Sequence, residues 1–126
     1  MKAFARIRYG DYEWTDLDDF KEKYDSRNNP ENYEKRVALW YRCDNIGYLY
    51  KAKVIDINTV LNIGGLHVEV IWAKFRHIIT SFRGTDFSCN AFKNWEHLAE
   101  VIREKRRERN DTWAFVDSLW EGSEYR

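Results

Sequence analysis

The clearest pattern of apolar and polar positions along the chain begins at Asn29. Asn29 followed by Pro30 is typical of a helix N-cap and a first helical residue, because the donor that proline lacks is unused there. Beyond them, apolar residues recur mostly three or four positions apart, at Tyr33, Val37, Trp40, Tyr41, Ile46, Leu49, Tyr50 and Val54. This spacing predicts one helix of about 22 residues, the longest element of the chain.

Gly47 interrupts this predicted helix, where it costs about 1 kcal/mol relative to alanine. Either another helix crosses closely at this point or the helix breaks in two, and we favour the close crossing. A rival interpretation is a strand over residues 48–57, which has β-branched residues near its end but also Lys51 and Lys53, both poor strand formers. Asp56 then predicts a capped short helix from Ile57 to Ile63.

Gly64 and Gly65 are expected to end that short helix in the left-handed conformation. From Leu66 to Arg83 the apolar residues again fall at helical spacing, at Val68, Ile71, Trp72, Phe75, Ile78, Ile79 and Phe82. A strand would place Lys74 and Arg76 on the same face as Val68 and Trp72, so a helix is favoured.

A further helix is predicted after a polar connector, with Phe92, Trp95, Ala99 and Ile102 forming its apolar stripe and residues 103–109 its charged end. A short helix is expected from Thr15 to Asp25, and a final amphipathic turn or two is expected around Trp113, Val116, Leu119 and Trp120. Asn110 to Thr112 are expected to form a break and a cap. Residues 2–9 are read as either a strand or a helical turn, and residues 121–126 as a frayed tail.

These elements predict an all-α fold, a single-domain bundle of about five helices with a short N-terminal extended or helical segment. The domain covers residues 1–126, with a core at about 15–109 and a short terminal helix and tail in 110–126. At 126 residues and 44% apolar composition, the chain is long enough to bury one core. Its 17% aromatic content indicates that Trp, Tyr and Phe provide much of that burial.

Charge and cysteine content narrow the class of protein. Lys and Arg balance Asp and Glu at 21 each, which lacks the basic excess of a dedicated nucleic-acid binder. Cys43 and Cys89 are expected to be reduced thiols in a cytoplasmic protein, because the chain starts without a secretory signal. No stretch approaches about 18 uncharged apolar residues, so no membrane span is predicted.

Several short motifs occur together along the middle of the chain: Ile46-Gly47-Tyr48-Leu49, Val54 to Ile57, the Gly64-Gly65 pair, Trp72 with Lys74 and Phe75, Arg83, and Trp95 to Ala99. They resemble the motifs of an uncharacterised prokaryotic all-helical family known only as a domain of unknown function, and Trp95 to Ala99 is similar to that family's "FExLA" segment. The resemblance covers roughly residues 33–102 and implies an all-helical fold with no known activity. Members often carry a hydrophobic anchor before the domain, which this chain lacks, and Trp95 stands where they have Phe.

Catalytic and metal chemistry have little support in the sequence. His97 and Glu100, three residues apart, place two metal-capable side chains on one helix, with Glu69 and Glu96 as the only plausible additions. Neither Cys43 nor Cys89 has a general base identifiable from spacing, and no phosphate-binding loop occurs. We therefore predict no catalytic residue, no bound metal and no cofactor, and an enzyme is the less favoured reading.

The basic run near the end of the chain is the candidate nucleic-acid contact. Its cations are Arg103, Lys105, Arg106, Arg107 and Arg109, and Trp113 lies close enough in sequence to stack on a base. Glu104 and Glu108 can pair with neighbouring cations along the helix, so a solvated surface is favoured. An acidic stretch over residues 11–34 complements this run, which invites either docking within one molecule or head-to-tail association.

Three tryptophans lie outside the best helical stripes: Trp14, Trp113 and Trp120. Such residues anchor either a terminal segment to its own core or a partner protein to a surface. The sequence does not determine the function. By elimination we favour a non-enzymatic helical protein-interaction module, acting on a protein partner or on a second copy in a homodimer. The alternatives are a nucleic-acid-associated accessory protein using residues 103–109 and a metal-binding or enzymatic helical protein.

Overall fold

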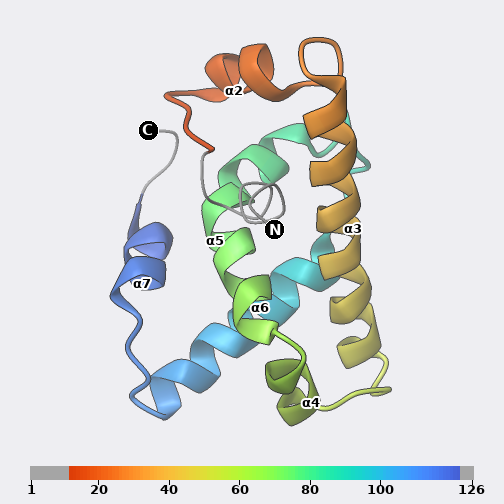
Figure 1. The fold of residues 1–126 in the computed structure, drawn as a ribbon. Helices are drawn as coiled ribbons and strands as arrows, with labels where there is room; N and C mark the ends of the chain where they lie inside the picture. The colour runs from red at the N-terminus through yellow and green to blue at the C-terminus, as the bar shows by residue number, and fades with distance from the viewer. Residues whose placement is uncertain (1–11, 123–126) are drawn as a thin grey trace.

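The computed structural model describes residues 12–122, and over that range it contains six helices and no strand. The helices are α2 (Leu17–Tyr24), α3 (Pro30–Lys51), α4 (Ile57–Asn62), α5 (Gly65–Phe82), α6 (Lys93–Glu108) and α7 (Ala114–Glu121). They form the all-α single-domain bundle that the sequence predicts (Figure 1). The expectations for residues 2–9 and for the end of the tail fall outside the described range.

Helix α5 is the centre of the bundle (Figure 1), with α3 and α7 on opposite sides and α6 crossing it. Side chains all around α5 are buried, including Val70 and Ala73, which lie off the predicted apolar stripe. A helix that is apolar on every side is typical of a fully surrounded position. Two buried aromatic residues of α5 pack edge to face on rings of the neighbouring helices. Phe75 contacts Trp40 of α3, and Trp72 contacts Trp95 of α6.

Helix α3 is one unbroken helix of 22 residues, capped by Asn29, whose Oδ1 accepts from Asn32 N at 3.3 Å. Gly47 lies where α3 meets the start of α6. A Cβ at this position would overlap the carbonyl group of Asn94 and lie 2.9 Å from the nitrogen of Trp95. The close-crossing interpretation of Gly47 is therefore confirmed, and the strand over residues 48–57 is wrong.

Asp44, which interrupts the apolar pattern of α3, caps the first turn of α6. Its Oδ1 accepts from Trp95 N at 2.9 Å, which replaces the N-cap side chain that Phe92 does not provide. The buried face of α3 consists of Arg36, Leu39, Trp40, Cys43 and Gly47. Residues of the apolar pattern such as Tyr41 lie outside this face and are exposed.

The connection from α3 to α5 has two left-handed residues. Lys53, with φ 65°, follows the end of α3, and Val54 N donates to Leu49 O at 2.9 Å, as in a Schellman ending. Asp56 caps α4 as predicted, accepting from Thr59 N at 2.8 Å, and α4 ends at Asn62, one residue before the predicted end. Gly64 has φ 96°, in agreement with the predicted left-handed ending, but the same prediction for Gly65 is wrong, because Gly65 is the first residue of α5.

The outer helices also differ from prediction only at their ends. Helix α2 is capped by Asp16, one residue after the expected Thr15 start, and Asp16 Oδ1 accepts from Asp19 N at 2.8 Å. Helix α7 confirms the final amphipathic segment, but its N-cap residue is Trp113 rather than one of residues 110–112. No helix within residues 12–122 is long and apolar enough to cross a membrane.

Candidate functional site

The three tryptophans singled out from the sequence all pack against the chain's own core. Trp120 is buried, and its Nε1 donates to Glu69 Oε2 at 2.8 Å. Trp14 stacks on Phe75 with ring centroids 5.6 Å apart, and Trp113 is partly buried at the start of α7. Anchoring of the chain's own terminal segments is therefore their visible role, and contact with a partner stays a prediction.

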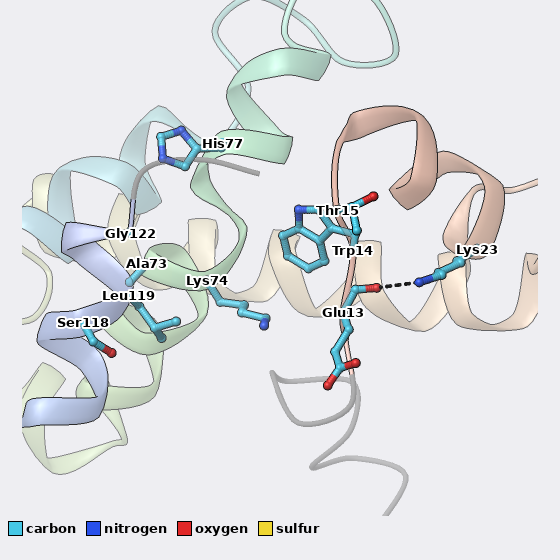
Figure 2. Close-up of a pocket in the computed structure, with 10 residues that line it drawn as sticks. All are labelled: Glu13, Trp14, Thr15, Lys23, Ala73, Lys74, His77, Ser118, Leu119 and Gly122. Carbon is cyan, nitrogen blue, oxygen red and sulfur yellow. Dashed lines mark hydrogen bonds between the residues drawn. The ribbon is translucent and has the colours of Figure 1, made fainter. Parts of the chain in front are cut away.

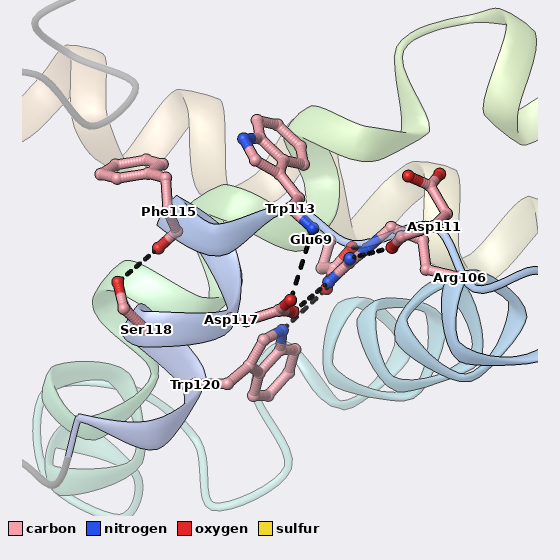
Figure 3. Close-up of polar contacts among 8 residues, drawn as sticks. All are labelled: Glu69, Arg106, Asp111, Trp113, Phe115, Asp117, Ser118 and Trp120. Atoms are coloured by element: carbon pink, nitrogen blue, oxygen red, sulfur yellow. Dashed lines mark hydrogen bonds and ion pairs between the residues drawn. The ribbon is translucent and has the colours of Figure 1, made fainter.

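Arg106, expected on a solvated surface, is buried with only 5% of its side chain exposed. Its Nε and Nη2 donate to the two carboxylate oxygens of Glu69 at 2.8 and 2.7 Å, and Nη2 also reaches Asp117 Oδ1 at 2.9 Å (Figure 3). The carbonyl oxygen of Asp111 accepts from Nη1 at 2.8 Å. The expectation of a free cation at Arg106 is wrong, because Glu69 pairs with it across the interface between α5 and α6.

We call Glu69, Arg106, Asp117 and Trp120 the buried ion cluster. Glu69 is fully buried and accepts three hydrogen bonds, two from Arg106 and one from Trp120. The hydrogen bond to Glu69 raises the pKa of Arg106, and the hydrogen bond from Arg106 lowers the pKa of Asp117. Every carboxylate oxygen of Glu69 has a donor, and the hydrogen bonds of the cluster join α5, α6 and α7.

A sequence signal for this cluster exists. The buried residues Trp95, Ala99, Ile102 and Arg106 follow one another at steps of four, three and four, so Arg106 continues the buried stripe of α6. Glu69 is the only acid in the sequence of α5. A cation on a buried stripe and a lone acid in an apolar helix together indicate an ion pair.

The rest of the basic run is largely engaged on the surface. Lys105 pairs with Glu108 at 3.6 Å, and Arg107 lies 3.9 Å from Glu104. The guanidinium of Arg103 lies 4.5 Å from the centre of the Trp120 ring. Arg109 is left as an exposed cation, so few charges of this run face solvent without a neighbouring partner. In Figure 1 this end of α6 lies at the opposite end of the molecule from α2, so the acidic and basic segments do not dock within one molecule.

The candidate metal residues are separated. His97 and Glu100 are exposed, whereas Glu96 pairs with Arg83 at 3.0 Å. Over residues 12–122 no three His, Cys, Asp or Glu side chains are grouped so as to hold a metal ion. Both cysteines are free thiols, and burial raises the pKa of Cys43 to about 12, which keeps it protonated.

A cleft of about 620 Å³ lies between the segment before α2 and helix α7, above α5 (Figure 2). Trp14 and Leu119 form its apolar sides, and the ammonium of Lys74 lies 5.1 Å from the centre of the Trp14 ring. Burial lowers the pKa of Lys74, although Glu13 opposes this effect. The cleft places one of the predicted tryptophans beside a partly desolvated cation.

A second concave surface lies where α3 ends and α4 begins. We call it the α3–α4 corner and define it as the exposed Tyr48, Leu49 and Val54 together with a groove of about 470 Å³ lined mainly by Tyr50, Lys51, Lys53, Ile55, Ile57 and His97. Six large hydrophobic side chains are exposed in the described part of the chain, and four of them lie between Tyr48 and Ile63. Apolar exposure is therefore concentrated in one stretch of the chain, from the last turn of α3 to the residue after α4.

In a comparison with known proteins, no family model, no curated protein and no solved structure matches this chain. The resemblance to an uncharacterised helical family accordingly stays a prediction. The surfaces of the molecule are therefore the basis for a proposed function.

Proposed function

We propose that this protein is a non-enzymatic helical module that binds a protein partner through the α3–α4 corner. The observation that carries the proposal is the concentration of exposed apolar side chains beside a groove. Val54 is 66% exposed and Tyr48 is 57% exposed, although both are large apolar or aromatic residues. Apolar area gathered in this way is typical of a surface that is covered by another molecule.

The charges at the corner indicate the chemistry of the partner. Lys51 and Lys53 line the groove, and within residues 12–122 neither forms an ion pair. Asp56 is the acid beside them, and it accepts from Thr59 N as the cap of α4. We infer that the partner presents an amphipathic segment with acidic side chains next to its apolar face.

The polar groups elsewhere support a binding role over a catalytic one. Glu69 and Asp117 both accept hydrogen bonds from Arg106, and the thiol of Cys43 is buried and protonated. A nucleophile or general base needs a free, partly accessible group near a reacting atom. These buried groups instead fix the positions of the helices that present the corner.

The test is a pull-down with the whole chain as bait, followed by affinity measurements on the purified partner. The variants are Tyr48→Ala and Lys53→Glu at the corner, and the matched control is Phe115→Ala on α7, where the side chain is 49% exposed. Loss of an anchor or reversal of a complementary charge typically weakens an interface by tenfold or more. We expect both corner variants to bind at least about tenfold more weakly and the control to bind unchanged. Added salt should weaken binding of the wild type more than of Lys53→Glu.

Four results would overturn the proposal. One is a partner that binds both corner variants as tightly as the wild type, and another is the absence of any retained partner. A concentration-dependent mass in light scattering that Tyr48→Ala abolishes would identify the occupant as a second copy. Oligonucleotide binding that falls steeply with salt and is lost in Arg109→Gln would instead support the nucleic-acid alternative.

A further inference from the structure

Arg36 on α3 is a buried cation that has no carboxylate partner within residues 12–122. Its side chain is 1% exposed, and no carboxylate in the described part of the chain forms an ion pair with it. Nη2 donates to Tyr24 O at 2.7 Å and Nε donates to Asn32 Oδ1 at 3.4 Å. The guanidinium carbon lies 5.0, 5.4 and 4.7 Å from the ring centres of Phe20, Tyr33 and Trp40.

The comparison with Arg106 shows what Arg36 lacks. Both are buried arginines on long helices, but Arg106 meets the carboxylates of Glu69 and Asp117, whereas Arg36 meets aromatic rings, an amide, a carbonyl and the hydroxyl of Tyr12. Burial lowers the pKa of Arg36 to about 10. A cation held this way keeps a strong attraction for any anion that can reach it.

Arg36 is one of the residues that line a cavity. The cavity has a volume of about 210 Å³, and Arg36 lines it together with Phe20, Tyr33, Phe82 and Phe87. The exposed residues Ser26, Arg27 and Asp86 also line it, which places its opening at the loop between α2 and α3 and the loop after α5. The cavity therefore opens to solvent, and its lining includes the buried Arg36 and several aromatic residues.

We propose that this cavity binds a small aromatic carboxylate, with the carboxylate on the guanidinium of Arg36 and the ring among Phe20, Phe82 and Phe87. A planar carboxylate matches the edge of a guanidinium, and a flat ring matches aromatic walls. A dianion such as phosphate fits less well, because Asp25 and Asp86 also line the cavity. The site is separate from the α3–α4 corner and does not depend on its proposed partner.

The two acids at the cavity differ in their engagement. Asp25 Oδ1 accepts from the backbone nitrogens of Arg27 and Asn28 at 3.0 and 2.7 Å, so its charge is already bonded. Asp86 is exposed and forms no ion pair with Arg36. Asp86 should therefore weaken the binding of an anion by repulsion, and removing its charge should strengthen that binding.

The test is calorimetric titration of the whole protein with benzoate. Benzamide has the same shape without the charge, and acetate has the charge without the ring. We expect benzoate to bind at least about tenfold more tightly than either, because the site combines a charge-assisted hydrogen bond with ring burial. Arg36→Met should abolish the preference for benzoate over benzamide, and Arg42→Met, at an exposed arginine of the same helix, should leave it unchanged.

Two measurements keep the test decisive if Arg36→Met does not fold. The Nε–H signal of Arg36 in a nitrogen–proton spectrum should shift on addition of benzoate and stay fixed with benzamide. Asp86→Asn should bind benzoate several-fold more tightly than the wild type. Equal affinity for benzoate and benzamide, an unmoved Arg36 signal, no binding at millimolar benzoate, or weaker binding by Asp86→Asn would each overturn the proposal.

Discussion

Replacing Arg106 by methionine should lower the free energy of unfolding by about 3–5 kcal/mol. Methionine keeps most of the length of the arginine stem, so the change removes charge and donors with little loss of packing. Glu69, with no exposed surface, would lose two of its three donors and keep only Trp120 Nε1. A fully buried carboxylate with one remaining donor is the source of the expected loss.

The double variant Glu69→Leu with Arg106→Met separates the buried charge from the packing. An apolar pair in place of a buried ion pair is often neutral or stabilising, so most of the loss should be recovered. A deficit of about 1–2 kcal/mol should persist, because Trp120 Nε1 loses its acceptor. Glu69→Leu alone should cost at least as much as this deficit, because it removes the same acceptor from Trp120 Nε1. The coupling between the two substitutions is therefore expected to be at least about 3 kcal/mol, well above that of independent sites.

Urea unfolding followed by far-ultraviolet circular dichroism measures these values, with Arg107→Met as the exposed control. A loss below about 1 kcal/mol, or a double variant no more stable than the single one, would refute the reasoning.

Three further substitutions or treatments test other parts of the structure. Gly47→Ala should destabilise the protein by about 1–3 kcal/mol in urea unfolding, although alanine favours helices, because the new Cβ meets the backbone of the first turn of α6; an unchanged midpoint would contradict the close crossing. In the native protein a thiol reagent should modify Cys89 rapidly and Cys43 only on unfolding, because burial raises the pKa of Cys43 to about 12; two equally fast thiols would count against this burial. Because the pKa of Lys74 is lowered in the folded state, the wild type should become more stable as pH rises toward the ordinary lysine pKa. Lys74→Met should stabilise the protein at neutral pH and reduce this gain in stability with pH. Identical pH dependence of the two proteins would show that Lys74 is not desolvated.

The boundaries of the helices were predictable because the signals for them are local. Asn29 and Asp56 each cap the helix that follows them through a hydrogen bond three residues away, and Gly64 adopts the left-handed conformation beside its own helix. Each of these interactions is complete within one turn of the chain, so the sequence contains both partners. The role of Gly47 was only partly predictable. The stability cost of a glycine within a helix predicts a close neighbour, but only the fold identifies that neighbour as the start of α6.

The buried faces were harder to predict, because polarity alone does not decide which side of a helix is covered. In α3 the buried positions Arg36, Trp40, Cys43 and Gly47 lie at steps of four, three and four, whereas Val37, the apolar neighbour of Arg36, is only partly buried. The positions of the other helices determine which face of α3 is buried, and Arg36 is buried because it lies on that face. Asp44 shows the same effect, since its role becomes visible only when Trp95 of α6 is placed next to it.

The two buried arginines occupy similar positions in their helices. Arg36 is the first residue, and Arg106 the last, of a buried stripe with the same spacing of four, three and four residues. A spacing rule that ignores polarity would therefore identify both arginines as buried. It would not show that Arg106 meets carboxylates and that Arg36 meets aromatic rings. That distinction depends on whether a neighbouring helix presents an acid, as α5 presents Glu69 to Arg106, or aromatic rings, as Phe20 and Trp40 face Arg36. Breaking a buried ion pair is costly, and a buried cation that lines a cavity and has no counter-charge within residues 12–122 is where an anionic ligand has the most to gain.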